Sequence, residues 1–446
     1  MTGARRWTLL LAFLVGCAQE PRLAPPEGPP PARPSPEPPA LVPAPLVAFA
    51  EVRAELRLAG PALRGQATWS GVARRRGREL TLDAGAGLRL EVATSRPAAE
   101  VVAGPEGLAV SFARALEPGE PVELVLRYAL PDGASEVVRG AYLVGAQSPQ
   151  RWLPMVFAPD APARFDLRMD GVELVRFGAG APAPPHLAGF AAGPFARSEL
   201  EGIVLLAPRE AEPLDRRRLL ERAAEAAARL SGELGPLSGP WTLVVAPEAP
   251  AQELAGGATL PASTLLEVRE DPNEDWLLVH ELAHRWFGDH VRIATWGDLW
   301  IQEGLATWLV ARDKELRERG HGQSPTGLES AGYAREVRLW RGRLARALER
   351  GDDPRLVRPS ATHRDAGGAV VYARGALAMH ALRVRLGPTR FRALLRRVLR
   401  EHAGRALRTE AFVAMIPADA DAVVQDCVLS ARSRCEAASG SSPDPR

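Results

Sequence analysis

The sequence predicts a two-part α+β protein, with an N-terminal antiparallel β domain followed by a mainly helical domain. Between Leu46 and Pro208, short runs alternate apolar and polar residues and are separated by glycine and proline; clear examples are residues 79–82, 88–92 and 122–126. Such period-two runs are typical of half-buried strands. Residues 217–233 then form an amphipathic pattern rich in alanine and leucine, residues 241–246 read as one more strand, and helical patterns occupy most of the rest. We therefore expect domains over residues 46–210 and 211–437.

Composition excludes several classes of protein. The chain has 446 residues, of which 46% are hydrophobic and 25% charged, so it is long enough for more than one core and is not a disordered protein. The net charge of +2 is a small difference between 56 basic and 54 acidic side chains. This balance gives no overall attraction to polyanions, and we expect no nucleic-acid partner.

The first residues read as a targeting segment. Arg5 and Arg6 precede an apolar run, Trp7–Val15, which is too short to span a bilayer as a helix. The run closes on Leu-Val-Gly-Cys17, which resembles a bacterial lipobox. Residues 1–16 are therefore expected to be a lipoprotein signal peptide and Cys17 the acylated residue; the alternative is an ordinary signal peptide with an incidental cysteine.

The next segment suits a tether. Twelve prolines fall between Pro21 and Pro45, so we expect residues 17–45 to be a stiff linker that packs into no core. A multiply acylated cysteine would hold the protein on a membrane durably. The predicted location is the bacterial cell envelope, with Ala18 resembling an outer-membrane sorting residue and the periplasmic or surface face left open.

The C-terminal region holds the other two cysteines. A straight helix would place the Cα atoms of Cys427 and Cys435 about 12 Å apart, beyond the reach of a disulfide, so pairing requires a turn between them. The sequence leaves this pairing open. Residues 438–446 are small, polar and proline-containing, and we expect a disordered tail.

One motif carries the chemistry. His280-Glu281-Leu282-Ala283-His284 is an HExxH sequence inside an apolar helical pattern. Residues four apart share one face of a helix, so His280 and His284 can bind one Zn²⁺ while Glu281 lies beside it as a general base for water. A zinc site needs a third protein ligand, and Glu303, nineteen residues after His284, is the candidate.

The stretch HELAHRWFGDHVRIATWGDLWIQEGLATW, residues 280–308, resembles the signature of the aminopeptidase N family of gluzincin peptidases. The resemblance is specific over residues 274–308 and loose over the rest of 46–437. It implies a thermolysin-like catalytic domain, one Zn²⁺ per chain held by His280, His284 and Glu303, and Glu281 as the catalytic base. A later segment, residues 371–376, resembles the family's YxKGA segment, with Arg374 in place of lysine. It implies that Tyr372 stabilises the oxyanion, a choice over Tyr333 that spacing alone does not make.

The sequence departs from this family at several positions. The family has a GAMEN-type strand whose glutamate binds the substrate's α-amine, whereas the corresponding place here, residues 256–261, has no carboxylate. Gly256, Gly257 and Ala258 are nevertheless expected to line the substrate site. Glu253 or Glu267 is left open as a replacement, and so is the choice between aminopeptidase and endopeptidase. Asp289 and Gln302 also stand where the family usually has asparagine.

The second half of the chain is locally basic. Residues 331–408 contain nineteen arginines against six acidic residues. The pattern fits a solvated arginine-rich face, or contact with anionic lipid headgroups or acidic substrates.

These observations predict a zinc metallopeptidase that hydrolyses peptide bonds, with a peptide or protein as substrate and a membrane partner through the lipid anchor. Two alternatives stay open because fold and metal do not fix the substrate: an envelope-tethered, non-catalytic binding module, and a zinc hydrolase of non-peptide substrates. The natural substrate and the oligomeric state are left open.

Overall fold

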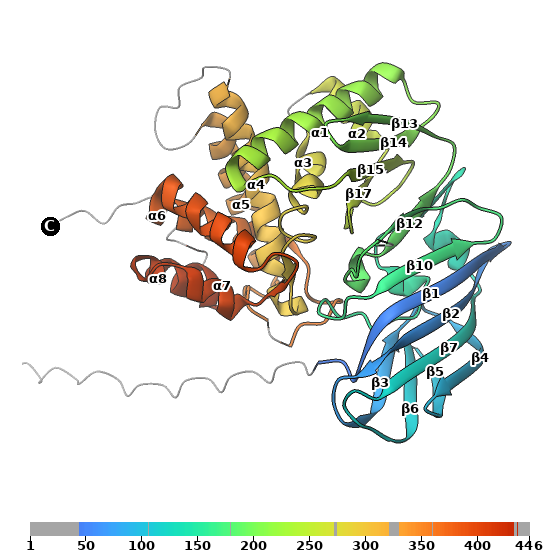
Figure 1. Ribbon diagram of the computed structural model, residues 1–446. Coiled ribbons are helices and arrows are strands. Elements are labelled where there is room, and N and C mark those ends of the chain that lie inside the picture. Colours follow the sequence, from blue (N-terminus) through green and yellow to red (C-terminus); the bar gives the residue numbers. More distant parts are fainter. Residues whose placement is uncertain are drawn as a thin grey trace, which may run out of the picture. The chain divides into compact units, whose positions relative to one another are not determined.

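The computed structural model describes residues 44–105, 107–178, 180–271, 274–320, 330–358, 360–431 and 435. The expected signal peptide, Cys17, most of the proline-rich linker and the C-terminal tail lie outside these residues. The described part belongs to one compact unit, in which a β-rich region precedes a helical region, as expected (Figure 1). No helix within the described ranges is both long and apolar enough to cross a membrane.

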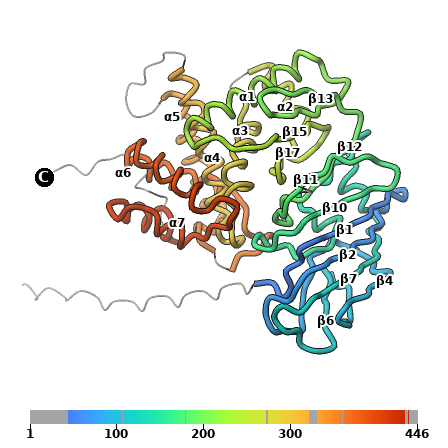
Figure 2. The backbone as a smooth tube through the Cα atoms, in the orientation of Figure 1, coloured from blue at the N-terminus to red at the C-terminus, as the bar shows by residue number. Residues whose placement is uncertain are grey.

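The described residues of the β-rich region form three sheets. Figure 2 traces the path of the backbone through this region. The largest has the order β10-β1-β2-β7-β4, from β1 (Val47–Ala59), β2 (Ala62–Ala73), β4 (Arg89–Arg96), β7 (Pro121–Leu130) and β10 (Arg164–Met169). The second is β3 (Gly77–Asp83), β6 (Gly107–Leu116) and β5 (Ala99–Gly104), and the third is β11 (Val175–Phe177), β12 (Gly189–Ala192), β9 (Tyr142–Gly145) and β8 (Val138–Arg139).

The alternating runs of the sequence form strands of these sheets, and their burial alternates in the same way, as along β7. The pairing is antiparallel except between β1 and β10, which run parallel. The core between the sheets contains Trp69, Phe112, Tyr128 and Trp152, each at most 2% exposed.

A mixed sheet joins this region to the helices. Its order is β13-β14-β15-β17-β16, from β13 (Phe195–Leu200), β14 (Ile203–Pro208), β15 (Trp241–Ala246), β16 (Gln252–Leu254) and β17 (Gly257–Pro261). The predicted strand at 241–246 is β15, and the amphipathic stretch at 217–233 lies within α1 (Pro213–Leu234), which connects β14 to β15. The short strand β16 forms the outer edge of this sheet.

The remaining chain is mainly helical. It consists of α2 (Ser263–Glu270), α3 (Trp276–Ala283), α4 (Leu299–Gly320), α5 (Ala331–Glu349), α6 (Ala369–Glu401), α7 (Thr409–Met415) and α8 (Asp421–Val423), with a two-stranded pair, β18 (Arg292–Ile293) and β19 (Ala406–Leu407). Short 3-10 turns lie at Gly133–Glu136, Pro149–Arg151, Pro185–Leu187, Trp296–Asp298 and Ala418–Ala420, and a π-helical turn at Val424–Leu429.

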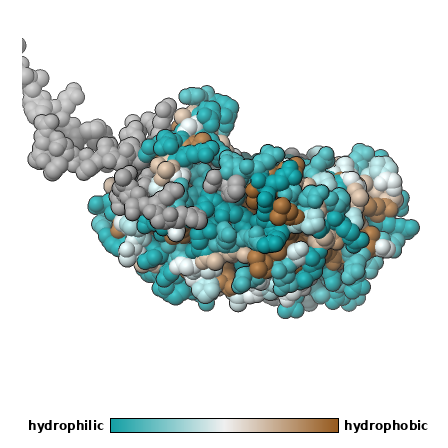
Figure 3. All heavy atoms as spheres, turned by 90° about the horizontal axis from the view of Figure 1, so that it is seen from above, coloured by the Kyte–Doolittle hydropathy of each residue, from teal (hydrophilic) through white to brown (hydrophobic). Residues whose placement is uncertain are grey.

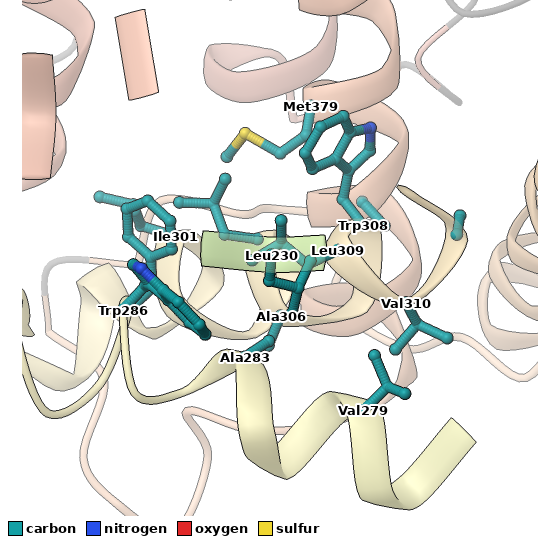
Figure 4. Packing of buried hydrophobic residues seen from close by; sticks show 14 of the residues in the cluster. Leu230, Val279, Ala283, Trp286, Ile301, Ala306, Trp308, Leu309, Val310 and Met379 are labelled. Atoms are coloured by element: carbon teal, nitrogen blue, oxygen red, sulfur yellow. The ribbon is translucent and has the colours of Figure 1, made fainter. Parts of the chain in front are cut away.

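A buried apolar cluster holds α1, α3, α4 and α6 together, and Figure 4 shows Val279 and Ala283 of α3 close to Ala306 and Val310 of α4. This packing fixes the two helices that carry the HExxH motif and Glu303. The surface in Figure 3 is mostly hydrophilic, with apolar side chains in smaller patches.

Candidate active site

The structure brings His280, His284 and Glu303 together. His280 lies in α3 and His284 at its C-terminus, so their side chains share one face, with 3.2 Å between the two Nε2 atoms. Glu303 Oε2 lies 3.2 Å from Nε2 of His280 and 3.7 Å from Nε2 of His284. Among the described residues, these three form the one group of His, Cys, Asp or Glu side chains whose ligand atoms lie within 4.8 Å of one another.

The turn before α4 holds Glu303 in position. Thr295 and Asp298 form a capping box, in which the carboxylate accepts hydrogen bonds from the backbone N–H and the hydroxyl of Thr295. The other oxygen of Asp298 accepts from the backbone N–H and the hydroxyl of Thr409. Trp300 Nε1 also donates to Thr409 Oγ1, at 3.0 Å. These bonds fix the start of α4, about one helical turn before Glu303.

The donor set fits a zinc ion. Burial lowers the pKa of His284 to about 4, so its imidazole is neutral at physiological pH, and Nδ1 lies 3.0 Å from the carbonyl oxygen of Phe287. Burial raises the pKa of Glu303, but His284 and His280 outweigh this effect and its pKa is lowered. Two neutral imidazoles and one carboxylate are the ligands of many catalytic zinc sites, which keep a further position open.

Glu281 and Tyr372 flank the three residues. Burial, and then the charge of Glu303, raises the pKa of Glu281 well above its usual range, as suits a group that accepts a proton. The Tyr372 ring lies 5.8 Å from that of His280 and its side chain hydrogen-bonds Glu303; the charge of Glu303, followed by burial, raises its pKa. Tyr333 instead bonds Trp308 Nε1, at 2.7 Å, within the core. Position thus separates the two tyrosines where sequence spacing did not.

Glu253 joins the same site. It lies on β16, is 5% exposed, and its Oε1 accepts a hydrogen bond from Gln302 Nε2. Its Oε2 lies 3.2 Å from His284 Nδ1 and has no hydrogen-bond partner among the described residues. Burial, and then the charges of Glu303 and Glu281, raises the pKa of Glu253 well above its usual range. The sequence left this residue only as an option, because a single glutamate before a glycine pair carries no distinctive signal.

The structure places Gly256, Gly257 and Ala258, the expected substrate-lining residues, at the β16–β17 turn and the start of β17. The N–H of Gly256 is donated to Asp289 Oδ2, at 3.1 Å, in the turn between β16 and β17. A Cβ on Gly257 would overlap the carbonyl oxygen of Thr242, so that residue is packed inside the sheet. Ala258 pairs with Glu253 across the two strands. Glu253, on the edge strand β16 next to this segment, is a carboxylate that lies beside His284.

Two departures from the family have structural explanations. Asp289 accepts the Gly256 N–H and so ties the loop after the HExxH motif to the β16–β17 turn. The guanidinium of Arg374 is fully buried and donates to four backbone carbonyls, those of Pro354, Asp426, Cys427 and Ser430. An arginine supplies five donors in a planar fork, whereas a lysine supplies three from one atom. The C-terminal segment is further closed by a disulfide between Cys427 and Cys435; Cys427 lies in the π-helical turn, which ends at Leu429.

Comparison with known proteins decides the family of this region. Residues 265–429, which contain the three candidate ligands, Glu281 and Tyr372, match the Peptidase family M1 domain. This segment is an M1 peptidase domain. A stretch of 83 residues is 39% identical to "Probable aminopeptidase 1" of Sulfurisphaera tokodaii and covers 17% of this chain and 10% of that protein. A stretch of 33 residues is 52% identical to mouse "Aminopeptidase N" and covers 7% of this chain and 3% of that protein. The chain thus matches a tenth or less of the length of these curated relatives.

Solved structures extend the likeness beyond the M1 domain. The M1 zinc metallopeptidase from Deinococcus radiodurans has a TM-score of 0.63 at 22% identity, over 87% of this chain and 95% of that one. Native leukotriene A4 hydrolase from Saccharomyces cerevisiae has a TM-score of 0.67 at 16% identity, over 85% and 66%. At these identities the likeness establishes the fold, which is that of the β-rich region followed by the M1 domain.

Proposed function

We propose that this protein is a zinc-dependent aminopeptidase that hydrolyses the first peptide bond of peptides with a free N-terminus. His280, His284 and Glu303 would hold the zinc ion. When bound, zinc polarises a carbonyl oxygen and makes water a stronger nucleophile near neutral pH. The curated relatives named above are aminopeptidases, which supports the reaction class.

The residues of the chain divide the remaining work. Glu281, buried and with a raised pKa, accepts the proton of the attacking water and later donates it to the leaving amine. The neutral hydroxyl of Tyr372 donates a hydrogen bond to the oxygen on which negative charge develops. Burial of Glu281 excludes bulk water from its carboxylate and strengthens these electrostatic effects.

The observation that carries aminopeptidase specificity is the position of the Glu253 carboxylate beside the candidate zinc ligands. Three buried carboxylates, those of Glu253, Glu281 and Glu303, influence one another's charge in this site. A divalent zinc ion would offset part of the negative charge that these carboxylates can carry, and a further cation would favour the ionised form of Glu253. An α-ammonium group supplies that charge, and its N–H groups can donate charge-assisted hydrogen bonds to the Glu253 carboxylate. The amine-binding carboxylate that residues 256–261 lack would thus come from β16.

The experiment is cleavage of a mixed peptide library, read by mass spectrometry, with the fragment from Leu46 and its Glu281→Gln variant. Successive loss of N-terminal residues that the variant abolishes, with one zinc per chain in both proteins, supports the proposal. Internal cuts would indicate an endopeptidase instead. Zinc binding without any cleavage would favour the binding module or a non-peptide substrate.

We also propose that Cys17 anchors the protein to a bacterial membrane, with the proline-rich linker as spacer. The disulfide between Cys427 and Cys435 supports an exported location, because disulfides persist in oxidising compartments. Mass spectrometry of the N-terminal peptide from the native host, together with membrane fractionation of a Cys17→Ser variant, tests this. A lipidated Cys17 and release of the variant into the soluble fraction are expected; an unmodified cysteine contradicts the anchor.

A further inference from the structure

The three candidate zinc ligands, His280, His284 and Glu303, are nearly closed to solvent. The exposure of the residues around them indicates the side from which a substrate can enter. His280 is 3% exposed and Glu303 is 6% exposed, whereas Trp276 and Tyr372, whose rings both stack on His280, are only partly buried. The Trp276 ring lies 4.7 Å from that of His280, at an interplanar angle of 13°. Solvent therefore meets the site on the side of Trp276 and Tyr372.

The two ends of the site differ in charge. Glu253 lies against His284, while Trp276 lies against His280, so these residues flank opposite ends of the histidine pair. On the proposed function, a peptide whose ammonium group meets Glu253 and whose first carbonyl meets Tyr372 would extend its C-terminal part past His280 toward Trp276. The residues near Trp276 would then contact the part of the substrate that leaves as the shortened peptide.

Arg343 on α5 is the cation at that end. Its Cζ lies 5.7 Å from the centre of the Trp276 ring, the side chain is exposed, and it forms no ion pair with any carboxylate in the described residues. The neighbouring Arg335, in contrast, lies 3.8 Å from Glu274. Other arginines of this half of the chain are buried in ion pairs; Arg383, for example, pairs with Glu315. Arg343 is thus a cation held beside an aromatic ring with its charge available.

We propose that Arg343 is a specificity-determining residue that binds a substrate carboxylate on the C-terminal side of the cleaved bond. This inference rests on the proposed function and names its substrate class: short peptides that carry a carboxylate within two or three residues of the cleaved bond. An extended peptide advances about 3.3 Å per residue, so this length covers the distance from His280 past Trp276 to the guanidinium. The source is either the free C-terminus of a di- or tripeptide or an acidic side chain.

The test compares tri-alanine with tri-alanine amide, and Ala-Asp-Ala amide with Ala-Asn-Ala amide, using the zinc-loaded protein. We expect the wild type to prefer the free acid over the amide by about fivefold in kcat/KM, since exposed ion pairs of this kind are weak. The Arg343→Gln variant should bring this ratio close to one through a higher KM for the acid, and Arg343→Lys should restore part of it. The Asp/Asn pair shows whether a side-chain carboxylate is bound in the same way.

Arg338→Gln is the matched control, because Arg338 is exposed on the same helix and has no contact with Trp276. It should keep the wild-type ratio. If the Arg343→Gln variant has the same acid/amide ratio as the wild type, the inference is overturned. The aminopeptidase proposal still stands in that case. If the wild type cleaves none of the four peptides, the proposed function fails, and the role of Arg343 fails with it.

Discussion

The backbones of Gly304 on α4 and Gly375 on α6 lie in direct contact. A Cβ added at Gly304 would stand 2.7 Å from the carbonyl carbon of Gly375, and one added at Gly375 would stand 2.9 Å from the Cα of Gly304. This crossing is adjacent in sequence to Glu303 and one helical turn from Tyr372. The absence of two side chains therefore allows α6 to place the tyrosine against the carboxylate.

We expect Gly304→Ala to push α4 and α6 apart. Backbone atoms cannot move aside as a flexible side chain can, so unfolding should become easier by about 1–3 kcal/mol, the usual cost of overpacking. Activity should fall more than stability because Glu303 and Tyr372 separate. Urea denaturation measures the change in stability, and kcat/KM measures the change in activity. Gly342→Ala on α5 is the control, since its Cβ meets only the end of the Arg346 side chain at 3.4 Å, and it should keep wild-type stability or exceed it.

Removing the charge of Glu253 should weaken selection for a free amine. The Glu253→Gln variant keeps the size of the side chain but loses a charge-assisted hydrogen bond, worth about 1.5–3 kcal/mol. We expect kcat/KM for an alanine anilide with a free amine to fall by about 10- to 100-fold. The same anilide with an N-acetylated amine is the reference substrate, against which the preference for a free amine is measured. Glu267→Gln, on the exposed face of α2, should behave like wild type. An undiminished preference for the free amine in Glu253→Gln would remove Glu253 from this role.

Trp276 should support zinc binding through His280. The Nδ1 atom of His280 is buried without a hydrogen-bond partner among the described residues, so the stacked Trp276 ring, rather than a hydrogen bond, restrains the imidazole. Partners that orient a ligand histidine commonly change metal affinity by about 10–100-fold. We expect Trp276→Leu to weaken zinc affinity about tenfold in competition with a chelator, and Trp276→Phe to retain most of it. Equal affinity in all three proteins, each folded by circular dichroism, would contradict this restraint.

Acid should destabilise the protein partly through His186. Burial lowers the pKa of His186 to about 3, whereas an unfolded histidine titrates near 6.5. Between these values the unfolded chain binds the proton and the folded protein does not, so stability is lost as the pH falls below 6.5. The loss from this residue should be on the order of 2–3 kcal/mol at pH 4.5.

Urea unfolding at pH 7 and pH 4.5 measures this effect. The His186→Gln variant should lose less stability between the two pH values than the wild type, because its side chain does not titrate. The same pH sensitivity in both proteins would assign the acid effect to other groups.

The sequence alone was sufficient where local spacing carries the information. The i, i+4 spacing of His280 and His284 fixes both imidazoles on one face, because a helix advances a full turn in 3.6 residues. Period-two alternation likewise predicted strands such as β7, because one face of each sheet is buried. The strand at 241–246 and the helix around 217–233 followed from the same patterns.

Only the tertiary structure decided what depends on contacts between distant segments. Glu253 reaches His284 because strand β16 pairs at the edge of the sheet, and Tyr372 rather than Tyr333 meets Glu303 because Gly304 and Gly375 permit α4 and α6 to touch. The pairing of Cys427 with Cys435 is possible because the helical conformation ends at Leu429, where the chain becomes extended at Ser430. Residue spacing determines which side chains share one element, whereas packing between elements determines which of them meet across the site.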